Sequence, residues 1–400
     1  MFTHSLQLRS SGDPSSRDNG NPGVGIFKLC YPAPSETFIT TQARALTGYA
    51  PLILARKRNG VTTLPMLAVS DHDPWGFRQG WLALTGSPSL FLKDERVRNL
   101  ALVHAHSGPD GVYALRLAER LALPLVVTYH GQDATCRNWP LFRSLLGVTV
   151  ARYFRFRHRL QATCGAVIAV SDFIGECLLA RGLSPEKIHR LYIGVDTERF
   201  RPLPETPGAD NEQYILNVAR HLPVKGVATL LRAFARIAGE HPRVQLLQVG
   251  AGPLAESLRG LTRELGITHR VRFLGSLSHE EILLLMQRAE IFALSSQTVR
   301  SGAREALGMV LNEASACGVA IAATRCGGIP EAVLHGETGL LSPEQDDRTL
   351  ADNLNRLLAD GELRRRLGLR GREFVSRQFC LGKQTAKLER LYDLLVEKNR

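Results

Sequence analysis

Two glutamates stand eight positions apart in the stretch 304–318, where apolar residues recur at helical spacing. This repeat predicts a helix that packs on a core and ends at Gly318. Glu313 falls at the edge of the apolar side, where a carboxylate needs a fixed partner. Glu305 precedes the helix, so we expect it to point toward a sugar and Glu313 toward a ribose. The free N–H groups of the first turn should bind phosphate, and they belong to Leu307, Gly308, Met309 and Val310.

Two cations follow the first strand that we expect in the second half of the chain. Arg220 and Lys225 lie in the turn between this strand, 214–218, and a helix predicted over 227–238. Such a turn places two positive charges and a helix N-terminus at one point, an arrangement that suits a diphosphate. The alternative is a solvated loop with two ordinary surface cations.

A histidine directly follows a strand that we expect in the first half, at 125–129. Open parallel sheets bind ligands at this end of their strands. His130, with Gly131 after it, could therefore hydrogen-bond a donor sugar. The alternative is a structural histidine whose bonds are satisfied within the fold. His104 and His106 lie on a neighbouring strand, where we expect one to approach the ligand site and the other the core.

Short β-branched runs alternate with amphipathic stretches from residue 26 onward, which indicates βαβ units on parallel sheets. The 400 residues exceed what one core usually supports. We therefore predict an α/β protein with two Rossmann-like, doubly wound domains that face each other across a cleft. The first domain should span 25–195 and the second 212–380, with a proline-rich linker over 196–211.

The composition limits the location of the protein and the kinds of partner that it can bind. Residues 1–24 are rich in Ser, Gly, Asp, Asn and Pro and should form a disordered tail. Without an apolar signal or an apolar run of membrane length, the protein is expected in the cytoplasm. Seven scattered cysteines indicate reduced thiols. The formal net charge of +12 points to an anionic partner, such as a nucleotide, a lipid or a nucleic acid.

The stretch around the two glutamates resembles a known family. Glu305 and Glu313 match the Glu-x7-Glu motif of retaining glycosyltransferases of family 4, which have the GT-B fold, and 318–341 is similar to the continuation of that motif. The resemblance extends from about residue 26 to about residue 380. It implies transfer of a hexose-type sugar, with UDP as the commonest carrier, to a hydroxyl acceptor. It also implies that a last helix, 381–400, crosses back to the first domain.

The resemblance assigns roles to the residues already singled out. Arg220 and Lys225 would hold the donor diphosphate, while His130 and Glu305 would orient the transferred sugar as the catalytic residues. Cations in place of a metal imply that no metal or other cofactor is required. Attack on the same face would need no nucleophile from the protein, and the leaving phosphate can take the proton of the acceptor. The loop 275–278 would present backbone groups to the nucleotide base, with Leu277 among them.

The acceptor side is indicated by a turn after the first strand. Ser35 and Glu36 begin a Ser-Glu-Thr-Phe sequence that resembles the polysaccharide-assembly branch of the family. This resemblance implies a lipid-linked or polysaccharide acceptor. Within the cytoplasm the protein could also contact the inner face of the membrane peripherally. An anionic membrane could also attract a run of cations interleaved with aromatic residues. The alternative is a solvated helix whose aromatics pack inward; the cations are Arg152, Arg155, Arg157 and Arg159.

The sequence is also compatible with two other functions. A nucleotide-sugar epimerase can use the same kind of two-domain cleft, although the Glu-x7-Glu stretch favours a transferase. A non-catalytic protein that binds nucleic acid or an acidic membrane would also explain the positive charge. The transferase is the leading hypothesis, and it needs no nucleic-acid partner.

Overall fold

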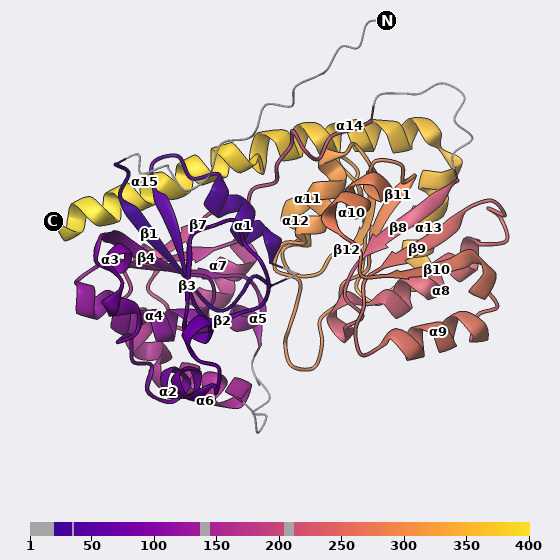
Figure 1. Ribbon diagram of the computed structural model, residues 1–400. Coiled ribbons are helices and arrows are strands. Elements are labelled where there is room, and N and C mark those ends of the chain that lie inside the picture. The colour runs from indigo at the N-terminus through magenta and orange to yellow at the C-terminus, as the bar shows by residue number, and fades with distance from the viewer. Residues whose placement is uncertain (1–19, 34–35, 137–144, 204–211) are drawn as a thin grey trace, which may run out of the picture.

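The computed structural model describes residues 20–33, 36–136, 145–203 and 212–400. In this part of the chain two separate sheets, built of parallel strands, lie side by side with helices around each (Figure 1). The prediction of two doubly wound α/β domains is therefore confirmed. No helix in the described ranges has both the length and the apolar character needed to cross a bilayer.

The first sheet has seven strands. Its core strands are almost entirely apolar, as is usual for parallel strands that are covered on both faces. In spatial order they are β3 (Met66–Ala68), β2 (Ala50–Arg58), β1 (Gly23–Tyr31), β4 (Leu100–Ala105), β5 (Leu125–Tyr129), β6 (Ala166–Ala169) and β7 (Ile188–Arg190).

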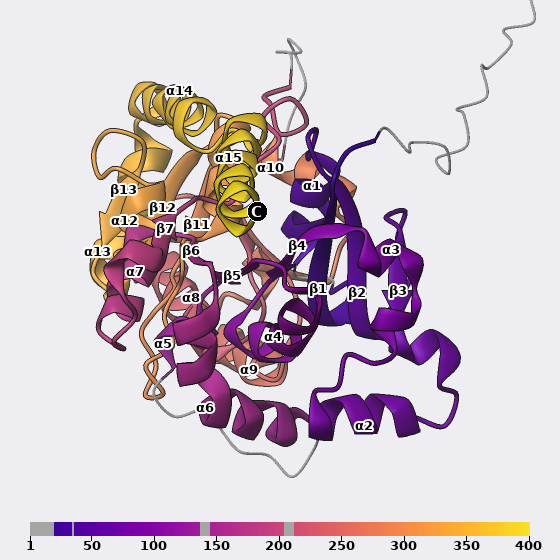
Figure 2. The ribbon, with the colours of Figure 1, turned by 90° about the vertical axis from the view of Figure 1, so that its left-hand side faces the viewer.

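The helices of this half cover both faces of the first sheet. Those packed on one face share a core with Phe27, Val103 and Val127. Figures 1 and 2 show two of them, α2 and α6, along the lower side of the domain. The helices are α1 (Thr37–Arg44), α2 (Phe77–Thr85), α3 (Glu95–Arg98), α4 (Gly108–Leu121), α5 (Gln132–Thr135), α6 (Leu145–Thr163) and α7 (Asp172–Leu179), with short 3-10 turns at Val69–His72, Phe91–Lys93 and Pro185–Lys187.

The second sheet has six strands, again with the earliest strand of its half in the interior. In both sheets the order reverses beside that strand, and the crevice at such a reversal is where ligands bind. The strands are, in spatial order, β10 (Val271–Gly275), β9 (Gln245–Val249), β8 (Tyr214–Val218), β11 (Ile291–Leu294), β12 (Ala320–Thr324) and β13 (Leu340–Ser342).

The helices of the second half complete the molecule. Two 3-10 turns, Pro223–Lys225 and Thr268–Arg270, accompany them. The helices are α8 (Val227–Ile237), α9 (Ala255–Glu264), α10 (His279–Met286), α11 (Met309–Ala316), α12 (Ile329–Ala332), α13 (Asp347–Ala359), α14 (Gly361–Gln378) and α15 (Leu381–Asn399).

The last helix returns to the first sheet. Leu388, Leu391 and Tyr392 of α15 are buried in the same core as Val24 and Ile53. Figure 1 shows α14 and α15 running along the upper side of both halves.

The two chain crossings between the halves lie side by side. The amide of Val195 donates to the carbonyl of Phe379 (2.7 Å), and the amide of Leu381 donates to the carbonyl of Val195 (2.9 Å).

Several expected boundaries differ from the structure. The expected tail, 1–24, overlaps β1, which begins at Gly23 because two glycines there let the chain lie against the side chain of Leu100. Residues 1–19 of that tail and 204–211 of the expected linker lie outside the described residues. Val195 and Phe200 pack into the core of the second half.

The helix expected within 304–318 covers only Met309–Ala316, so it is shorter than the stretch in which apolar residues recur at helical spacing. α11 begins after Gly308, whose φ of 82° interrupts the helical conformation.

Candidate active site

Two loops of the second half meet in an ion pair. Lys225 Nζ lies 2.6 Å from Glu305 Oε2, which also accepts a hydrogen bond from the Ser296 hydroxyl (2.9 Å). Lys225 ends the turn before α8, and Gly226 follows with a φ of 59°. A Cβ at Gly226 would lie 1.9 Å from the Ser295 carbonyl oxygen, so only glycine lets the two loops approach this closely.

The electrostatics keep Glu305 ionised. Burial alone would raise its pKa, but the charge and hydrogen bond of Lys225, the Ser296 hydroxyl and the charge of Arg220 together hold the pKa below its ordinary value. Arg220 is exposed and has no hydrogen bond or ion pair to any described side chain. The cluster therefore keeps one cation free for an anionic ligand.

The start of α11 follows this cluster in the chain. Gly308 is its N-cap residue, and Leu307 before it is buried. The amides of Leu307, Gly308, Met309 and Val310 donate to no acceptor within the described ranges. Free amides at a helix N-terminus, near two cations, can bind phosphate.

Glu313 lies one turn further along α11. Burial raises its pKa to about 7, and only the charge of Arg199 acts in the opposite direction. Among the described residues, no hydrogen bond acts on the carboxylate. The fixed partner expected for this carboxylate is therefore not found among the described residues, and a ligand hydroxyl would have an unoccupied acceptor here.

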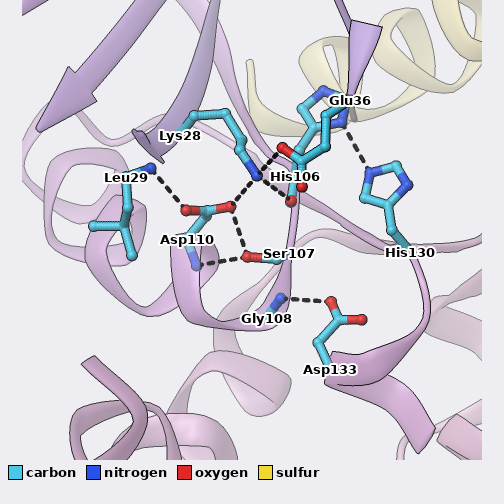
Figure 3. Close-up of polar contacts among 9 residues, drawn as sticks. All are labelled: Lys28, Leu29, Glu36, His106, Ser107, Gly108, Asp110, His130 and Asp133. Carbon is cyan, nitrogen blue, oxygen red and sulfur yellow. Dashed lines mark hydrogen bonds and ion pairs between the residues drawn. The ribbon is translucent and has the colours of Figure 1, made fainter. Parts of the chain in front are cut away.

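His130 lies at the end of β5 in the first half, where Figure 3 shows its ring beside that of His106. The Nε2 of His130 and the Nδ1 of His106 share a hydrogen bond of 3.1 Å, and Phe38 packs against the His130 ring. Burial, together with the charges of Lys28 and His104, lowers the pKa of His130 well below its usual value. Its Nδ1 is buried without a partner among the described atoms, so a neutral imidazole has one nitrogen left for a ligand.

The neighbouring histidines do not divide between site and core as expected, because both are buried and their rings stack on each other. His104 bonds to the hydroxyls of Tyr392 (2.6 Å) and Thr128 (2.7 Å), so it faces the core beneath α15. His106 stacks on His104 with ring centroids 4.2 Å apart and reaches toward His130.

A buried lysine beside His130 was missed in the sequence. Lys28 Nζ lies 2.9 Å from Glu36 Oε2 and 3.2 Å from Asp110 Oδ2, and it donates to the His106 carbonyl at 3.3 Å (Figure 3). Burial lowers the pKa of Lys28, but the two carboxylates outweigh it and raise the pKa. The signal was present, because a lysine inside an apolar strand of a parallel sheet is rarely buried unless it is paired.

The carboxylates around Lys28 hold several loops together. Asp110 also accepts hydrogen bonds from the amide of Leu29 (2.8 Å) and the hydroxyl of Ser107 (2.6 Å). Glu36, placed on the acceptor side by the sequence, precedes α1 and is partly exposed. Ser35, its expected companion, lies outside the described residues.

The two halves touch beside these groups. The Ser171 hydroxyl donates to the Ala306 carbonyl (2.7 Å), and a Cβ added to Gly131 would lie 3.3 Å from the Ala306 Cβ. His130 precedes Gly131, and Glu305 precedes Ala306. This contact therefore brings the end of β5 close to the loop that carries Glu305.

An open cavity of about 460 Å³ adjoins this contact. It is lined from the first half by α5 and α7 and from the second half by the loop before Glu305. Among the residues that the structure describes, the charged ones in this lining are the cations Arg181, Arg300 and Arg304.

Leu277 is placed apart from the core of the site. It packs its side chain against the second core and lines a separate hollow with Tyr214 and Arg288, so only its backbone remains available for a base.

The four arginines of α6 do not act together. Arg152 donates to the carbonyls of Leu84 and Thr85, and Arg159 pairs with Glu119 (2.9 Å). Arg155 and Arg157 lie over the rings of Phe156 and Phe154.

The chain resembles known glycosyltransferases along most of its length. Residues 36–199 match the model of Glycosyltransferase Family 4, and residues 201–374 match that of Glycosyl transferases group 1. A GDP-mannose-dependent alpha-(1-6)-phosphatidylinositol monomannoside mannosyltransferase of Mycolicibacterium smegmatis is 34% identical over 324 residues, which are 76% of this chain and 82% of that protein. The N-acetyl-alpha-D-glucosaminyl L-malate synthase of Bacillus anthracis is 30% identical, with 74% of each chain covered.

Solved structures show the same fold. Anabaena HepE in complex with UDP-glucose superposes with a TM-score of 0.75 at 19% identity, over 94% of this chain and 100% of that one. WaaG, a glycosyltransferase involved in lipopolysaccharide biosynthesis, superposes with a TM-score of 0.66 at 18% identity, over 93% of this chain and 99% of that one. The architecture is therefore GT-B. On the family models and the curated relatives together, the chain belongs to glycosyltransferase family 4.

Proposed function

We propose that this glycosyltransferase moves a hexose-type sugar from a UDP-linked donor to a hydroxyl acceptor, with retention of the anomeric configuration and without a metal. The Lys225–Glu305 ion pair carries the proposal, because it lies beside free Arg220 on one side of the interdomain contact and His130 lies on the other. Such a site can hold a diphosphate and a sugar at once.

The proposed reaction needs no nucleophile from the protein. The bond between the anomeric carbon and the diphosphate breaks, and Arg220, Lys225 and the amides of residues 307–310 stabilise the negative charge that develops on the leaving oxygen. The acceptor oxygen bonds to the anomeric carbon on the same face, and its proton passes to the leaving phosphate. His130 and Glu305 orient the sugar, and Glu313 accepts from the ribose hydroxyls.

The acceptor is proposed to be a lipid-linked or polysaccharide intermediate. The mycobacterial relative is named for a phosphatidylinositol-linked acceptor. In this chain Glu36 stands beside Lys28 at the end of β1, next to the histidine that faces the sugar. The comparisons give no support to the epimerase alternative.

Lys225→Ala tests the diphosphate role. Losing one charge-assisted contact costs about 1.5–3 kcal/mol in binding, so affinity should fall about ten- to hundredfold and turnover further. Calorimetry with UDP and donor-turnover assays would measure both quantities. Lys387→Ala, an exposed lysine on α15, is the matched control. Wild-type affinity and turnover in Lys225→Ala would remove this residue from the site.

The donor, the stereochemistry and the metal requirement have separate tests. Thermal-shift screening against UDP, GDP, ADP, dTDP and their sugars should single out UDP, and a larger shift with GDP would correct the base. NMR of the first product should show the anomeric configuration of the donor. Activity should survive a chelator, so a loss that Mg²⁺ restores would contradict the metal-free reaction.

A further inference from the structure

Four large apolar side chains are exposed at one short helix of the first half. Trp75 precedes α2, and Phe77, Trp81 and Leu84 lie on it, with exposed fractions of 83%, 79%, 60% and 66%. The last three follow the i, i+4, i+7 spacing of a single helical stripe. We call these four residues the α2 patch.

The opposite side of α2 is buried, so the exposed stripe is not a product of fraying. Leu82 and Ala83 are almost fully buried. The Ala83 carbonyl accepts from the Tyr113 hydroxyl (2.8 Å), and the Thr85 carbonyl accepts from both Arg116 (2.6 Å) and Arg152 (2.8 Å).

These bonds anchor the C-terminal end of α2 on α4 and α6, which Figure 2 shows next to it. A rigid helix presents its apolar stripe outward.

Exposed cations lie on α2 and on α6, the helix that contacts it. Arg78 on α2 and Arg155 on the adjacent α6 are exposed, and neither forms an ion pair with a described carboxylate. The whole chain carries a formal net charge of +12. Tryptophan and arginine together are typical of the interfacial layer of a bilayer, where aromatic rings sit at the headgroups and cations meet anionic lipids.

The size of the patch favours a lipid surface over a protein partner. Stable protein interfaces bury about 800 Å² per partner over about 20–30 residues. The α2 patch is one helix wide and contains four apolar side chains. A bilayer needs no more than this, because an interfacial helix inserts a single apolar stripe.

We propose that the α2 patch docks the protein on an anionic bilayer surface, with Trp75, Phe77, Trp81 and Leu84 inserted among the headgroups. Arg78 and Arg155 contact the lipid phosphates. Docking of this kind goes beyond the proposed transfer reaction, and it would hold the enzyme on the surface that carries a lipid-linked acceptor. The sequence placed the membrane contact on the arginines of α6. The present proposal places it on α2 and retains only Arg155 from that run.

The test is binding of the full chain to large unilamellar vesicles of phosphatidylcholine with and without about 30% phosphatidylglycerol. The wild type should sediment with the anionic vesicles, and its tryptophan fluorescence should shift to shorter wavelength. Phe77→Ser/Trp81→Ser should lower the vesicle affinity by about tenfold or more, because two inserted rings are lost.

Two control variants isolate the apolar stripe and the cations. Leu369→Ser/Leu394→Ser changes two exposed leucines on α14 and α15 and should bind vesicles like the wild type. Arg78→Gln/Arg155→Gln should weaken binding to anionic vesicles only. Thermal shifts with UDP should be the same in all variants. A failure of the donor proposal would appear in these thermal shifts, whereas a failure of the docking proposal would appear only in the vesicle binding.

Two results would overturn the proposal. One is a wild-type protein that fails to sediment with anionic vesicles, or a Phe77→Ser/Trp81→Ser variant that sediments equally well. The other is a concentration-dependent dimer of the wild type, seen by light scattering and lost in this variant, because the patch would then bind a second copy of the chain.

Discussion

The two glutamates of the candidate site, Glu305 and Glu313, have different electrostatic surroundings. Glu305 has its cation at hydrogen-bonding distance, and its pKa falls although burial opposes this. Glu313 is half-buried on the same short segment without a donor among the described residues, and its pKa rises. A carboxylate that is already held by a cation, as Glu305 is by Lys225, stays ionised and in a fixed position, so it can orient a substrate. A carboxylate without a partner gains most from a ligand that donates to it.

Glu313→Gln should change how stability depends on pH. Burial raises the pKa of Glu313 from 4.5 to about 7 in the folded protein. The folded state therefore prefers the protonated form, and the free energy of unfolding falls as the pH rises from about 4.5 to about 7, by up to about 3 kcal/mol. The variant should be more stable than the wild type at about pH 8, and the difference should vanish toward pH 4.5. Urea unfolding across this range measures it.

The same variant tests the ribose role. Ribose hydroxyls that donate to Glu313 favour its ionised form, so UDP binding just below neutral pH should release protons from the wild type and fewer from Glu313→Gln. Calorimetry in two buffers of different ionisation enthalpy measures this release. Equal UDP affinity and equal proton release in the two proteins would refute the role.

Lys28→Met should destabilise the first half strongly. The change leaves Asp110 and Glu36 without their cation, and removing one partner of a buried ion pair typically costs about 3–5 kcal/mol. Chemical unfolding should show most of this loss, and adding Asp110→Asn should restore part of it. Lys57→Met, at an exposed position on β2, should unfold like the wild type. A Lys28→Met protein of unchanged stability would contradict the pairing.

At the scale of elements, short turns bring the charges together. The turn Pro223–Lys225 and the loop before Glu305 meet because glycine stands where their backbones approach, and α11 begins only after Gly308. In the first half, Asp133 accepts from the amides of Gly108 and Gly131, at 3.0 Å each, and so ties the turn after His130 to the start of α4. The helices and strands form the rigid part of each half, and these turns determine where the charged side chains point.

Gly226→Ala should disturb the second-half site through its backbone. A Cβ there would lie 1.9 Å from the Ser295 carbonyl oxygen, and the φ of 59° disfavours any side chain. We expect a loss of about 1–3 kcal/mol in stability and weaker UDP binding, since Lys225 would move. Gly239→Ala, where a Cβ meets no atom within 4 Å, is the control. Thermal unfolding with and without UDP measures both effects; an unshifted Gly226→Ala would exclude the tight approach.

On the scale of the whole molecule, contacts between the halves decide whether the cleft is complete. The carboxylate of Glu331 on α12 accepts from the amides of Asp172 and Phe173 at the start of α7 (2.7 and 2.9 Å) and from the Tyr192 hydroxyl (3.2 Å). Thr37 and His279 share a further interdomain hydrogen bond of 2.9 Å. These bonds join the halves around the site, and closure of two domains on a substrate excludes water from the space between them.

Glu331→Ala should loosen this arrangement. A carboxylate at a helix N-terminus contributes about 0.3–2 kcal/mol, so the variant should populate more open arrangements of the two halves. Small-angle scattering should show a larger radius of gyration without nucleotide, and turnover should fall more than UDP affinity. Glu337→Ala, an exposed glutamate nearby, should match the wild type. An identical scattering curve for Glu331→Ala would show that this carboxylate does not hold the halves together.

The sequence alone was enough to predict the two sheets and the loops that carry Arg220, Lys225, His130 and Glu305. Parallel strands bring their carboxyl ends to one edge, so a polar residue just after an apolar strand is placed by local pattern. The predicted boundaries of two elements were wrong at glycines. β1 begins at Gly23, inside the expected tail, and α11 begins only after Gly308.

Only the tertiary structure decided which partner each buried or exposed group has. Lys28 is paired with Glu36 and Asp110 because β1, the start of α4 and the residue before α1 come together, whereas Glu313 has no partner among the described residues. The stripe of α2 has the same period as a buried helix, yet it faces outward because Tyr113 and Arg152 hold the opposite side. Periodicity shows that a helix has two faces; which face is buried depends on the elements that pack against it.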